Sequence, residues 1–216
     1  MMISPEFFYE ENLKGKSPEQ IMSVIRSLKR KILKLKNIME HPDYASREWA
    51  MHPGEDVQLS MNREYLQRAI QALEEAGGTY NPSAAEQRAL KFENSIPYIK
   101  KVELCVGIHM GPYKTKAITI VDAKAYISKD LSLDATSTSS EIEMNKEEFF
   151  EELKYLHIGE WRKNYNASRF GIWVMDGTYW DLKIYFSNEH KPVKIHGDNA
   201  YPYNFNRLLE LFEIEE

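Results

Sequence analysis

Two histidines and several carboxylates gather in and beside one polar stretch of the sequence, residues 41–60, and groups of this kind can bind a metal ion. They are Glu40, His41, Asp43, His52, Glu55 and Asp56. Imidazole and carboxylate groups are ordinary ligands of divalent metals. However, each histidine precedes a proline, where helices tend to end, and the spacing matches no metal signature such as two histidines one helical turn apart. We therefore interpret the stretch as a loop and predict neither a metal nor another cofactor.

A second candidate is a group of aromatic and polar residues late in the chain, of the kind that lines ligand pockets and protein interfaces. From it we take six candidate binding residues and no catalytic residue: Trp161, Trp180, Asp198, Asn199, Tyr201 and Tyr203. The alternative is that the group serves packing. Trp173 and Trp180 would then flank the Asp176-Gly177 turn and enter the core, and Tyr201-Pro202-Tyr203 would brace the last helix.

A third candidate is a run of basic residues without an intervening carboxylate between Glu19 and Glu40. It consists of Arg26, Lys29, Arg30, Lys31, Lys34 and Lys36. A basic amphipathic helix can bind nucleic acid, a membrane surface or an acidic partner. No aromatic residue interleaves with these side chains to stack on bases, and the formal net charge of the whole chain is -5. We therefore predict a solvated helix face and do not expect nucleic acid as a partner.

Catalytic motifs are absent from the sequence. Cys105 is flanked by Leu104 and Val106 in an alternating pattern, with no base identifiable beside it. There is no phosphate-binding loop, dinucleotide fingerprint or nucleophile elbow. These observations lean away from an enzyme, although an uncommon active site need not contain a common motif.

The single cysteine also bears on the compartment, because one thiol cannot form an internal disulfide. Pro5 and Glu6 interrupt the first residues, so they do not resemble a secretion signal. No segment approaches the roughly 20 apolar residues that a membrane span requires. We predict a cytoplasmic protein that does not engage a membrane.

Helices are predicted first in the N-terminal part, which we assign to a helical hairpin arm, residues 1–78. Ser17-Pro18-Glu19-Gln20 is a capping box with proline at the first helical position. Apolar residues then repeat at heptad spacing: Ile21, Ile25, Leu28, Ile32, Leu35 and Met39. A second helix is predicted from about Met61 to Ala76, where Gly77-Gly78 ends it.

The heptad stripe must be buried against something, and the second helix is the nearest candidate. The apolar stripe of that second helix contains the small residues Ala69 and Ala76, so it offers less apolar surface than the stripe of the first helix. We expect the hairpin to pack also onto the remainder of the chain or onto a second copy, and favour the former slightly. A homodimer or another protein partner is therefore the partner hypothesis that the sequence supports.

Strands are predicted mainly in residues 79–216. Another capping box begins at Ser83, and alternation from Lys101 to Ile108 predicts a half-buried strand with a returning strand at 117–121. The next expected elements are a strand within 126–133, a polar loop at 134–140, a helix capped by Asn145, strands at 171–175, 179–186 and 193–196, and a helix over 208–212. Tight turns join these strands, so the predicted class is α+β, with a mainly antiparallel sheet and flanking helices that form one compact unit with the arm.

Several short segments carry a resemblance to a family of proteins. In the C-terminal third they are His157-Ile158-Gly159-Glu160-Trp161, Asp176-Gly177-Thr178-Tyr179-Trp180 and Gly197-Asp198-Asn199-Ala200-Tyr201-Pro202-Tyr203-Asn204-Phe205. In the N-terminal part they are Ser17-Pro18-Glu19-Gln20, Glu40-His41-Pro42-Asp43-Tyr44 and Ala76-Gly77-Gly78-Thr79-Tyr80. Together these segments resemble a family of uncharacterised cytoplasmic proteins from Firmicutes-type gut bacteria. The resemblance implies a bacterial cytoplasmic protein, and it supplies no catalytic residue because that family has no assigned activity.

Two functional hypotheses follow from these patterns. The first is a non-enzymatic protein-interaction or binding module. The alternative is a small-molecule-binding protein or enzyme with a pocket near the C-terminal aromatic loop. The shape of the region around Tyr201 distinguishes them. A shallow apolar surface would suit a protein partner, whereas a deep pocket with converging Asp198, His196 or His157 would suit the alternative.

Overall fold

The computed structural model describes residues 3–44, 46, 52–109, 111–128 and 142–214. The chain divides into two compact units, Met1–Pro82 and Ser83–Glu216, each of which is described by itself. The boundary predicted after residue 78 lies in the same connecting segment. The predicted polar loop at 134–140 and the end of the strand predicted within 126–133 fall outside the described residues.

The first unit is helical. Its helices are α1 (Pro5–Asn12), α2 (Pro18–Met39) and α3 (Glu55–Glu75), with a short 3-10 turn η1 (Pro42–Tyr44). The predicted capping box of α2 is confirmed, because the Ser17 hydroxyl accepts from the Gln20 N–H while the Gln20 side chain accepts from the Ser17 N–H. Helix α3 begins six residues earlier than predicted. Gly54 stands at its N-cap, and Glu55 and Asp56 in its first turn suit the helix dipole.

The heptad stripe of α2 forms part of the core of this unit. Ile21, Ile25 and Leu28 are buried in one cluster with Ala69, Ala72 and Leu73 of α3. The small alanines allow the two helices to approach closely. Phe8 and Leu13, from α1 and the residue after it, complete the cluster, and the Phe8 ring stacks on Tyr65 of α3 at 4.3 Å between centroids. The stripe thus contributes to an intramolecular core.

The second unit is an α+β structure, as predicted. Its helices are α4 (Ala84–Glu93), α5 (Lys146–Tyr155) and α6 (Phe205–Leu211), with 3-10 turns η2 (Ile96–Tyr98), η3 (Ile158–Glu160) and η4 (Ala167–Phe170). Its strands are β1 (Ile99–Ile108), β2 (Tyr113–Val121), β3 (Lys124–Ile127), β4 (Ile142–Asn145), β5 (Asn164–Asn166), β6 (Thr178–Phe186) and β7 (Val193–Asp198). Over the described residues they form one sheet in the order β4-β3-β2-β1-β6-β7-β5, with only β5 parallel to its neighbour.

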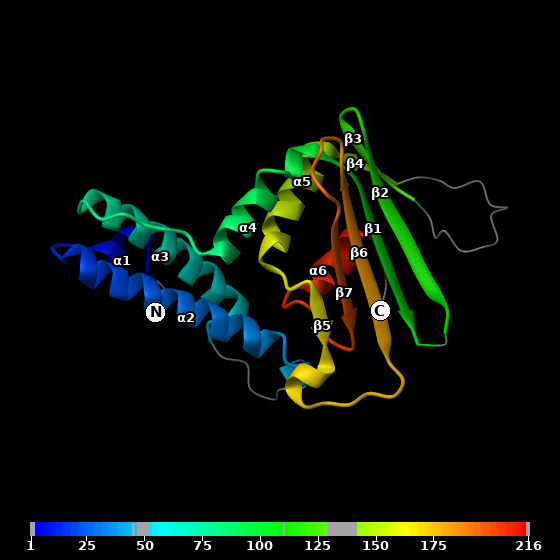
Figure 1. Cartoon of the computed structure of the whole chain (residues 1–216), viewed down its shortest axis with the longest axis horizontal. Coiled ribbons are helices and arrows are strands. Elements are labelled where there is room, and N and C mark those ends of the chain that lie inside the picture. Colours follow the sequence, from blue (N-terminus) through cyan, green and yellow to red (C-terminus); the bar gives the residue numbers. More distant parts are fainter. Residues whose placement is uncertain (1–2, 45, 47–51, 110, 129–141, 215–216) are drawn as a thin grey trace. The chain divides into compact units, whose positions relative to one another are not determined.

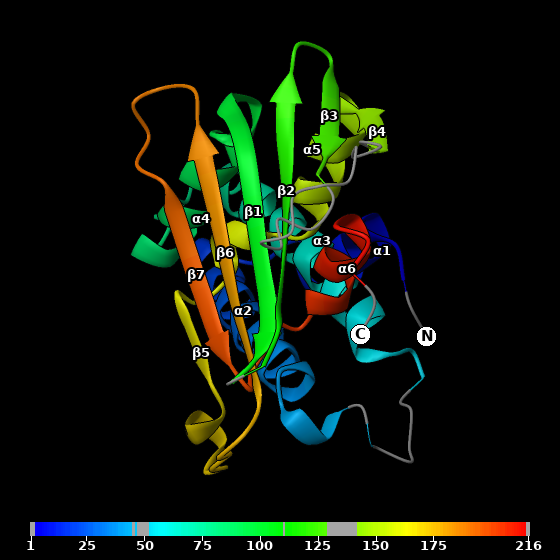
Figure 2. The same ribbon diagram turned by 90° about the vertical axis from the view of Figure 1, so that its right-hand side faces the viewer.

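The helices of this unit lie on one face of the sheet (Figures 1 and 2). Alternation along β6 turns Trp180, Leu182 and Ile184 inward, where they are fully buried. They join one apolar core with residues of α4, α5 and α6, including Phe92, Phe149, Leu153, Phe205 and Leu208. The intervening β6 residues face outward and stay half-exposed.

The predicted hairpin about Asp176-Gly177 is wrong. Residues 171–175 form no strand, and β6 pairs with β1 and β7 instead. The backbone groups at this turn bond to distant segments, because the Gly177 carbonyl accepts from the His109 N–H at 2.9 Å. Trp173 is 92% exposed, so the expectation that its side chain packs into the core is also wrong.

Candidate binding site

Asn199 holds the loop that follows β7 against the start of β6. Its backbone is left-handed, with φ of 53°, a conformation that asparagine tolerates better than most residues. The Asn199 N–H donates to the Thr178 carbonyl at 2.9 Å, and the Asn199 Oδ1 accepts from the Thr178 N–H at 2.9 Å. A Cβ at Gly177 would collide with the Asn199 amide, so the turn before β6 needs glycine at this point.

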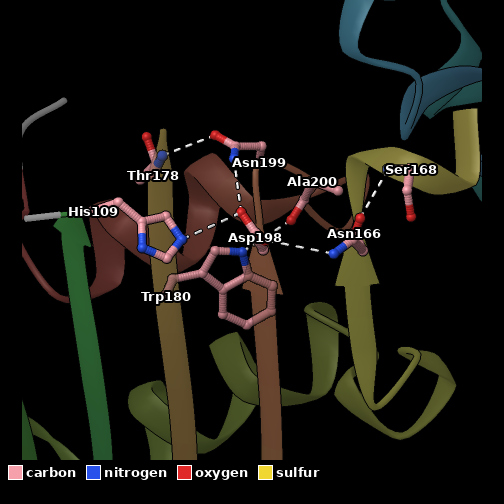
Figure 3. Close-up of polar contacts among 8 residues, drawn as sticks. All are labelled: His109, Asn166, Ser168, Thr178, Trp180, Asp198, Asn199 and Ala200. Atoms are coloured by element: carbon pink, nitrogen blue, oxygen red, sulfur yellow. Dashed lines mark hydrogen bonds and ion pairs between the residues drawn. The ribbon is translucent and has the colours of Figure 1, made fainter. Parts of the chain in front are cut away.

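Asp198 is the centre of a polar cluster beside this loop (Figure 3). Its Oδ1 accepts from the Asn199 Nδ2 at 2.7 Å and lies 3.7 Å from the His109 Nε2. Its Oδ2 accepts from the Asn166 Nδ2 at 3.5 Å. Asn166 in turn accepts from the Ser168 N–H and caps η4. The cluster therefore ties together residues at the ends of β1, β5 and β7.

The chemical capacity of this cluster is limited. A histidine oriented by a carboxylate can act as a general base when a substrate or nucleophile lies within hydrogen-bonding reach. The side chains that interact here are two amides, one carboxylate and one imidazole. Ser168 and Thr178, also drawn in Figure 3, take part through their backbone N–H groups. His109 and Asp198 are also 48% and 41% exposed. The arrangement is better suited to fixing the loop than to catalysis.

Trp180 supports the same loop from the core. Its indole is fully buried, and its Nε1–H donates to the Ala200 carbonyl at 3.0 Å. A Cβ at Gly197 would collide with this indole, which explains the glycine in β7. The Trp180 ring also packs against Phe205 of α6 at 4.7 Å between centroids. One side chain thus fixes both the loop and the start of α6.

A cavity of about 430 Å³ lies next to the supported loop, between the end of β1, the start of β2 and α6. We call it the α6 cavity. Its described lining is Val106, Gly107, Ile108, Pro112, Lys114, Thr178, Tyr201, Phe205, Asn206, Leu209 and Ile214. Most of these side chains are apolar. Lys114, from the inner face of β2, is the member of the described lining that is charged at neutral pH.

The six predicted binding residues are divided by the structure. Tyr201 lines the α6 cavity and packs on Phe205 at 5.0 Å between ring centroids. Asp198 and Asn199 form the adjacent polar cluster, and Tyr203 is half-buried in the same loop.

The two tryptophans among the predicted binding residues are both buried in the core. Trp180 belongs wholly to the core, as the packing alternative expected for this residue. Trp161 is also buried, and its Nε1–H donates to the Leu156 carbonyl at 3.1 Å.

The polar stretch of residues 41–60 contains no metal centre in its described part. Among the residues that the structure describes anywhere in the chain, no group of three or more His, Cys, Asp or Glu side chains could hold a metal ion. His41 lies 3.7 Å from the Asp43 carboxylate, and the Tyr44 hydroxyl donates to Glu55. These contacts stabilise the segment locally. Residues 45 and 47–51 of the stretch lie outside the described residues.

Tyr179 and Asp181 form a hydrogen-bonded pair on the outer face of the sheet. Asp181 lies opposite Cys105 in the pairing of β6 with β1. The Tyr179 hydroxyl donates to the Asp181 carboxylate. This hydrogen bond, together with partial burial and the negative charge of Asp181, raises the pKa of Tyr179 from 10.0 to about 12. Tyr179 is therefore a hydrogen-bond donor at neutral pH and not a base.

The raised pKa of Tyr179 makes the stability of the folded protein depend on pH. Because the folded-state pKa is raised, the stabilisation is fully present below about pH 10 and is lost as the pH rises toward 12. In ¹³C-tyrosine NMR we expect the Tyr179 ring to remain about 90% protonated at pH 11. Asp181→Asn should move the midpoint back toward that of free tyrosine. A midpoint near 10 in the unaltered folded protein would contradict the assigned hydrogen bond.

Sequence reasoning missed most of the α6 cavity. Alternation did place Val106 and Ile108 on the inner face of a strand, together with Val102 and Leu104. Val102 and Leu104 are fully buried, whereas Val106 is half-buried and Ile108 is 53% exposed. The distinction depends on how far α6 covers the sheet, and no local pattern reveals that distance.

The fold and site define an α+β unit whose helices lie on one face of its sheet, with an apolar cavity beside its last helix and a polar cluster at the ends of β1, β5 and β7. Neither a protein-family model, a curated protein nor a solved structure matches this chain. Over the described residues, no helix combines the length and the apolar character needed to cross a membrane.

Proposed function

We propose that this protein is a non-enzymatic binding protein whose ligand is a small molecule with an apolar body and a negatively charged head. The observation that carries the proposal is the α6 cavity. Its volume of about 430 Å³ is within the range of about 300–1,000 Å³ typical of small-molecule sites. Its apolar walls with a few polar groups match the usual composition of such sites.

The proposal combines parts of both sequence hypotheses. Tyr201 lines a cavity, as the small-molecule alternative requires. Asp198, His196 and His157 are not among the described lining residues, so the acid–base groups expected of an enzyme pocket do not converge there. Binding without a reaction is the function that this combination supports best.

The walls and the head group make separate contributions to the proposed affinity. Apolar side chains such as Val106, Phe205 and Leu209 would cover the body of the ligand. Each buried methylene is worth about 0.8 kcal/mol, which is about fourfold in Kd. Lys114 would attract a carboxylate or phosphate head, by about 0.2–1 kcal/mol for an exposed pair, or up to about fivefold in Kd.

A series of fatty acids tests the proposal. We expect butanoate, hexanoate and octanoate to bind with Kd values that fall about fourfold per added methylene until the cavity is filled. Octanoate binding should weaken severalfold in Lys114→Ala, while octanol binding stays unchanged. Isothermal titration calorimetry measures both. Affinity that does not depend on chain length would remove the case for the cavity.

The control for this experiment uses two residues of similar exposure. Ile108 lines the cavity and is 53% exposed, whereas Val121 of β2 is 50% exposed and lies outside the described lining. Ile108→Trp should block octanoate binding, and Val121→Trp should leave it unchanged. Equal binding to both variants would place the ligand elsewhere.

Protein binding is a second candidate function, favoured by the segment between η4 and β6. Trp173 and Met175 are 92% and 96% exposed there, with Val174 43% exposed between them. Exposed large apolar residues that follow one another are typical of protein interaction sites. We expect any such partner to lose affinity in Trp173→Ala with Met175→Ala, and to keep it in Ile108→Trp. The opposite pattern would argue against this segment.

The cytoplasmic location, the membership of the bacterial family and a homodimer of the helical arm stay predictions from the sequence. Cell fractionation tests the location, and light scattering tests the dimer.

A further inference from the structure

A groove with an unusual concentration of positive charge lies in the second unit, away from the α6 cavity. Its volume is about 810 Å³. Its described lining contains five side chains that are positive at neutral pH and a histidine, against one carboxylate, that of Glu189. The basic residues are Arg88, Lys91, Lys163, His190, Lys191 and Lys194. The whole chain has a net charge of -5, so this local excess is opposite in sign to the average.

Separate elements bring these charges together. Arg88 and Lys91 project from α4, Lys163 precedes β5, and His190 and Lys191 belong to the connection that leads into β7. Lys194 of β7 lies opposite Lys183, an outward-facing residue of β6, so Lys194 borders the groove at the sheet edge while its side chain lies on the outer face. Thr178 at one end of β6 lines the α6 cavity, whereas Phe186 at the other end lines the groove. The two sites therefore share no lining residue and lie at opposite ends of β6.

The walls of the groove are held by close packing. Gly159 in η3 lies against α4 so tightly that a Cβ there would be 2.8 Å from the Ala89 Cα and 2.9 Å from the Ala89 carbonyl oxygen. Phe92 and Phe186 are buried beneath the groove. The His190 ring packs against Phe186 at 5.7 Å between centroids. The groove thus has a fixed apolar floor and a charged rim.

Protection of a sheet edge explains only part of this charge. β5 pairs with β7 only from His196 onward, so Lys191, Pro192 and Lys194 border an edge left uncovered by β5. Lysine and proline on an edge strand discourage pairing with other chains. Arg88 and Lys91 lie on a helix, where no edge needs protection. The presence of these two charges in the same groove as Lys163 and Lys191 calls for another explanation.

We propose that this groove binds a phosphorylated small molecule of the nucleotide class, with its phosphates among the basic rim residues and its ring on the apolar floor. Arginine and lysine are the usual partners of phosphate oxygens, and the four charges of Arg88, Lys91, Lys163 and Lys191 suit a ligand with more than one phosphate. A volume of about 810 Å³ is sufficient for a ligand of this size. The proposal does not depend on the function of the α6 cavity.

Calorimetric titration with three probes tests the assignment. We expect ADP to bind, pyrophosphate to bind more weakly, and adenosine to show no binding at the same concentrations. The affinity for ADP should fall at least tenfold between 50 mM and 300 mM salt, because the rim interaction is ionic. Equal affinity for adenosine and ADP, or the absence of binding by both ADP and pyrophosphate, would overturn the proposal.

Charge-reversed variants locate the site. Lys91→Glu with Lys163→Glu should weaken ADP binding at least tenfold, whereas Arg26→Glu with Lys34→Glu on α2 makes the same change in net charge and should alter it less than twofold. All four side chains are exposed, so both proteins are expected to fold. If the groove variant fails to fold, Lys91→Gln with Lys163→Gln provides the comparison. Equal losses in both variants, or tighter binding of a ten-nucleotide RNA than of ADP, would refute a small-molecule site here.

Discussion

Replacing Trp180 with alanine is expected to lower the free energy of unfolding of the second unit by about 3–5 kcal/mol, the usual range for removing a buried aromatic side chain. The Trp180 side chain is fully buried, and it packs on Phe205, Tyr165 and Trp161. The change also removes the donor to the Ala200 carbonyl. Denaturant titration measures the free energy of unfolding, and hydrogen exchange on peptides from β1, β6 and β7 shows whether the decrease lies in the second unit.

Trp173→Ala is the matched control, because it removes the same side chain from a site that is 92% exposed. We expect a change within about 0.5 kcal/mol, as for most surface substitutions. Trp180→Ala should also weaken octanoate binding, since Phe205 loses its support beside the α6 cavity. Similar destabilisation by both substitutions would show that Trp180 is not the centre of this core.

The second large effect is expected in the first unit. Leu28→Ala should destabilise α2 and α3 by about 2–5 kcal/mol, because Leu28 is 4% exposed in the cluster formed with α3. Leu33, five residues further along α2, is 53% exposed. Leu33→Ala should therefore change stability by less than about 0.5 kcal/mol.

Hydrogen exchange of the α2 and α3 peptides separates these outcomes. Protection should fall in Leu28→Ala and persist in Leu33→Ala. If Leu28→Ala kept full protection, the heptad stripe would not be the core of the first unit. A shift from dimer to monomer without loss of protection would favour the homodimer expected as one possibility from the sequence.

Local patterns predicted the elements whose stabilising contacts are themselves local. The hydroxyls of Ser17 and Ser83 both form their capping boxes with residues three positions on, so sequence spacing alone reveals them. Asn145 likewise caps α5 through the Glu147 N–H at 2.7 Å. The alternation of β1 and the seam of α2 were recognisable because burial follows the period of each element.

Elements that depend on distant partners were not predictable in this way. Residues 171–175 have the apolar content of a strand, but the backbone groups of Gly177 and Thr178 bond to His109 and Asn199. Trp173, Val174 and Met175 are exposed. The three-residue strand β5 pairs in parallel with β7 and contains one buried side chain, Tyr165, which is too few for an alternating pattern to be recognised in the sequence. In both segments, hydrogen bonds to residues distant in the sequence determine whether a strand forms.

The candidate site was predictable only in part. Aromatic and polar composition drew attention to the loop after β7, where Tyr201 does line a cavity. Composition could not separate Tyr201 from Trp180, which is buried beneath the same loop. The groove rimmed by Arg88, Lys163 and Lys191 combines residues more than 100 positions apart, so no window of sequence contains it.

Methyl NMR of the protein labelled at isoleucine, leucine and valine tests the central claim, ligand binding in the α6 cavity, most directly. On titration with octanoate, we expect saturable changes in the methyl chemical shifts of four residues that line the cavity: Val106, Ile108, Leu209 and Ile214. The methyl groups of Ile21, Ile25 and Leu28 in the first unit should stay unchanged. Saturable shifts confined to residues outside the lining, or no shifts at millimolar octanoate, would contradict the proposed binding function.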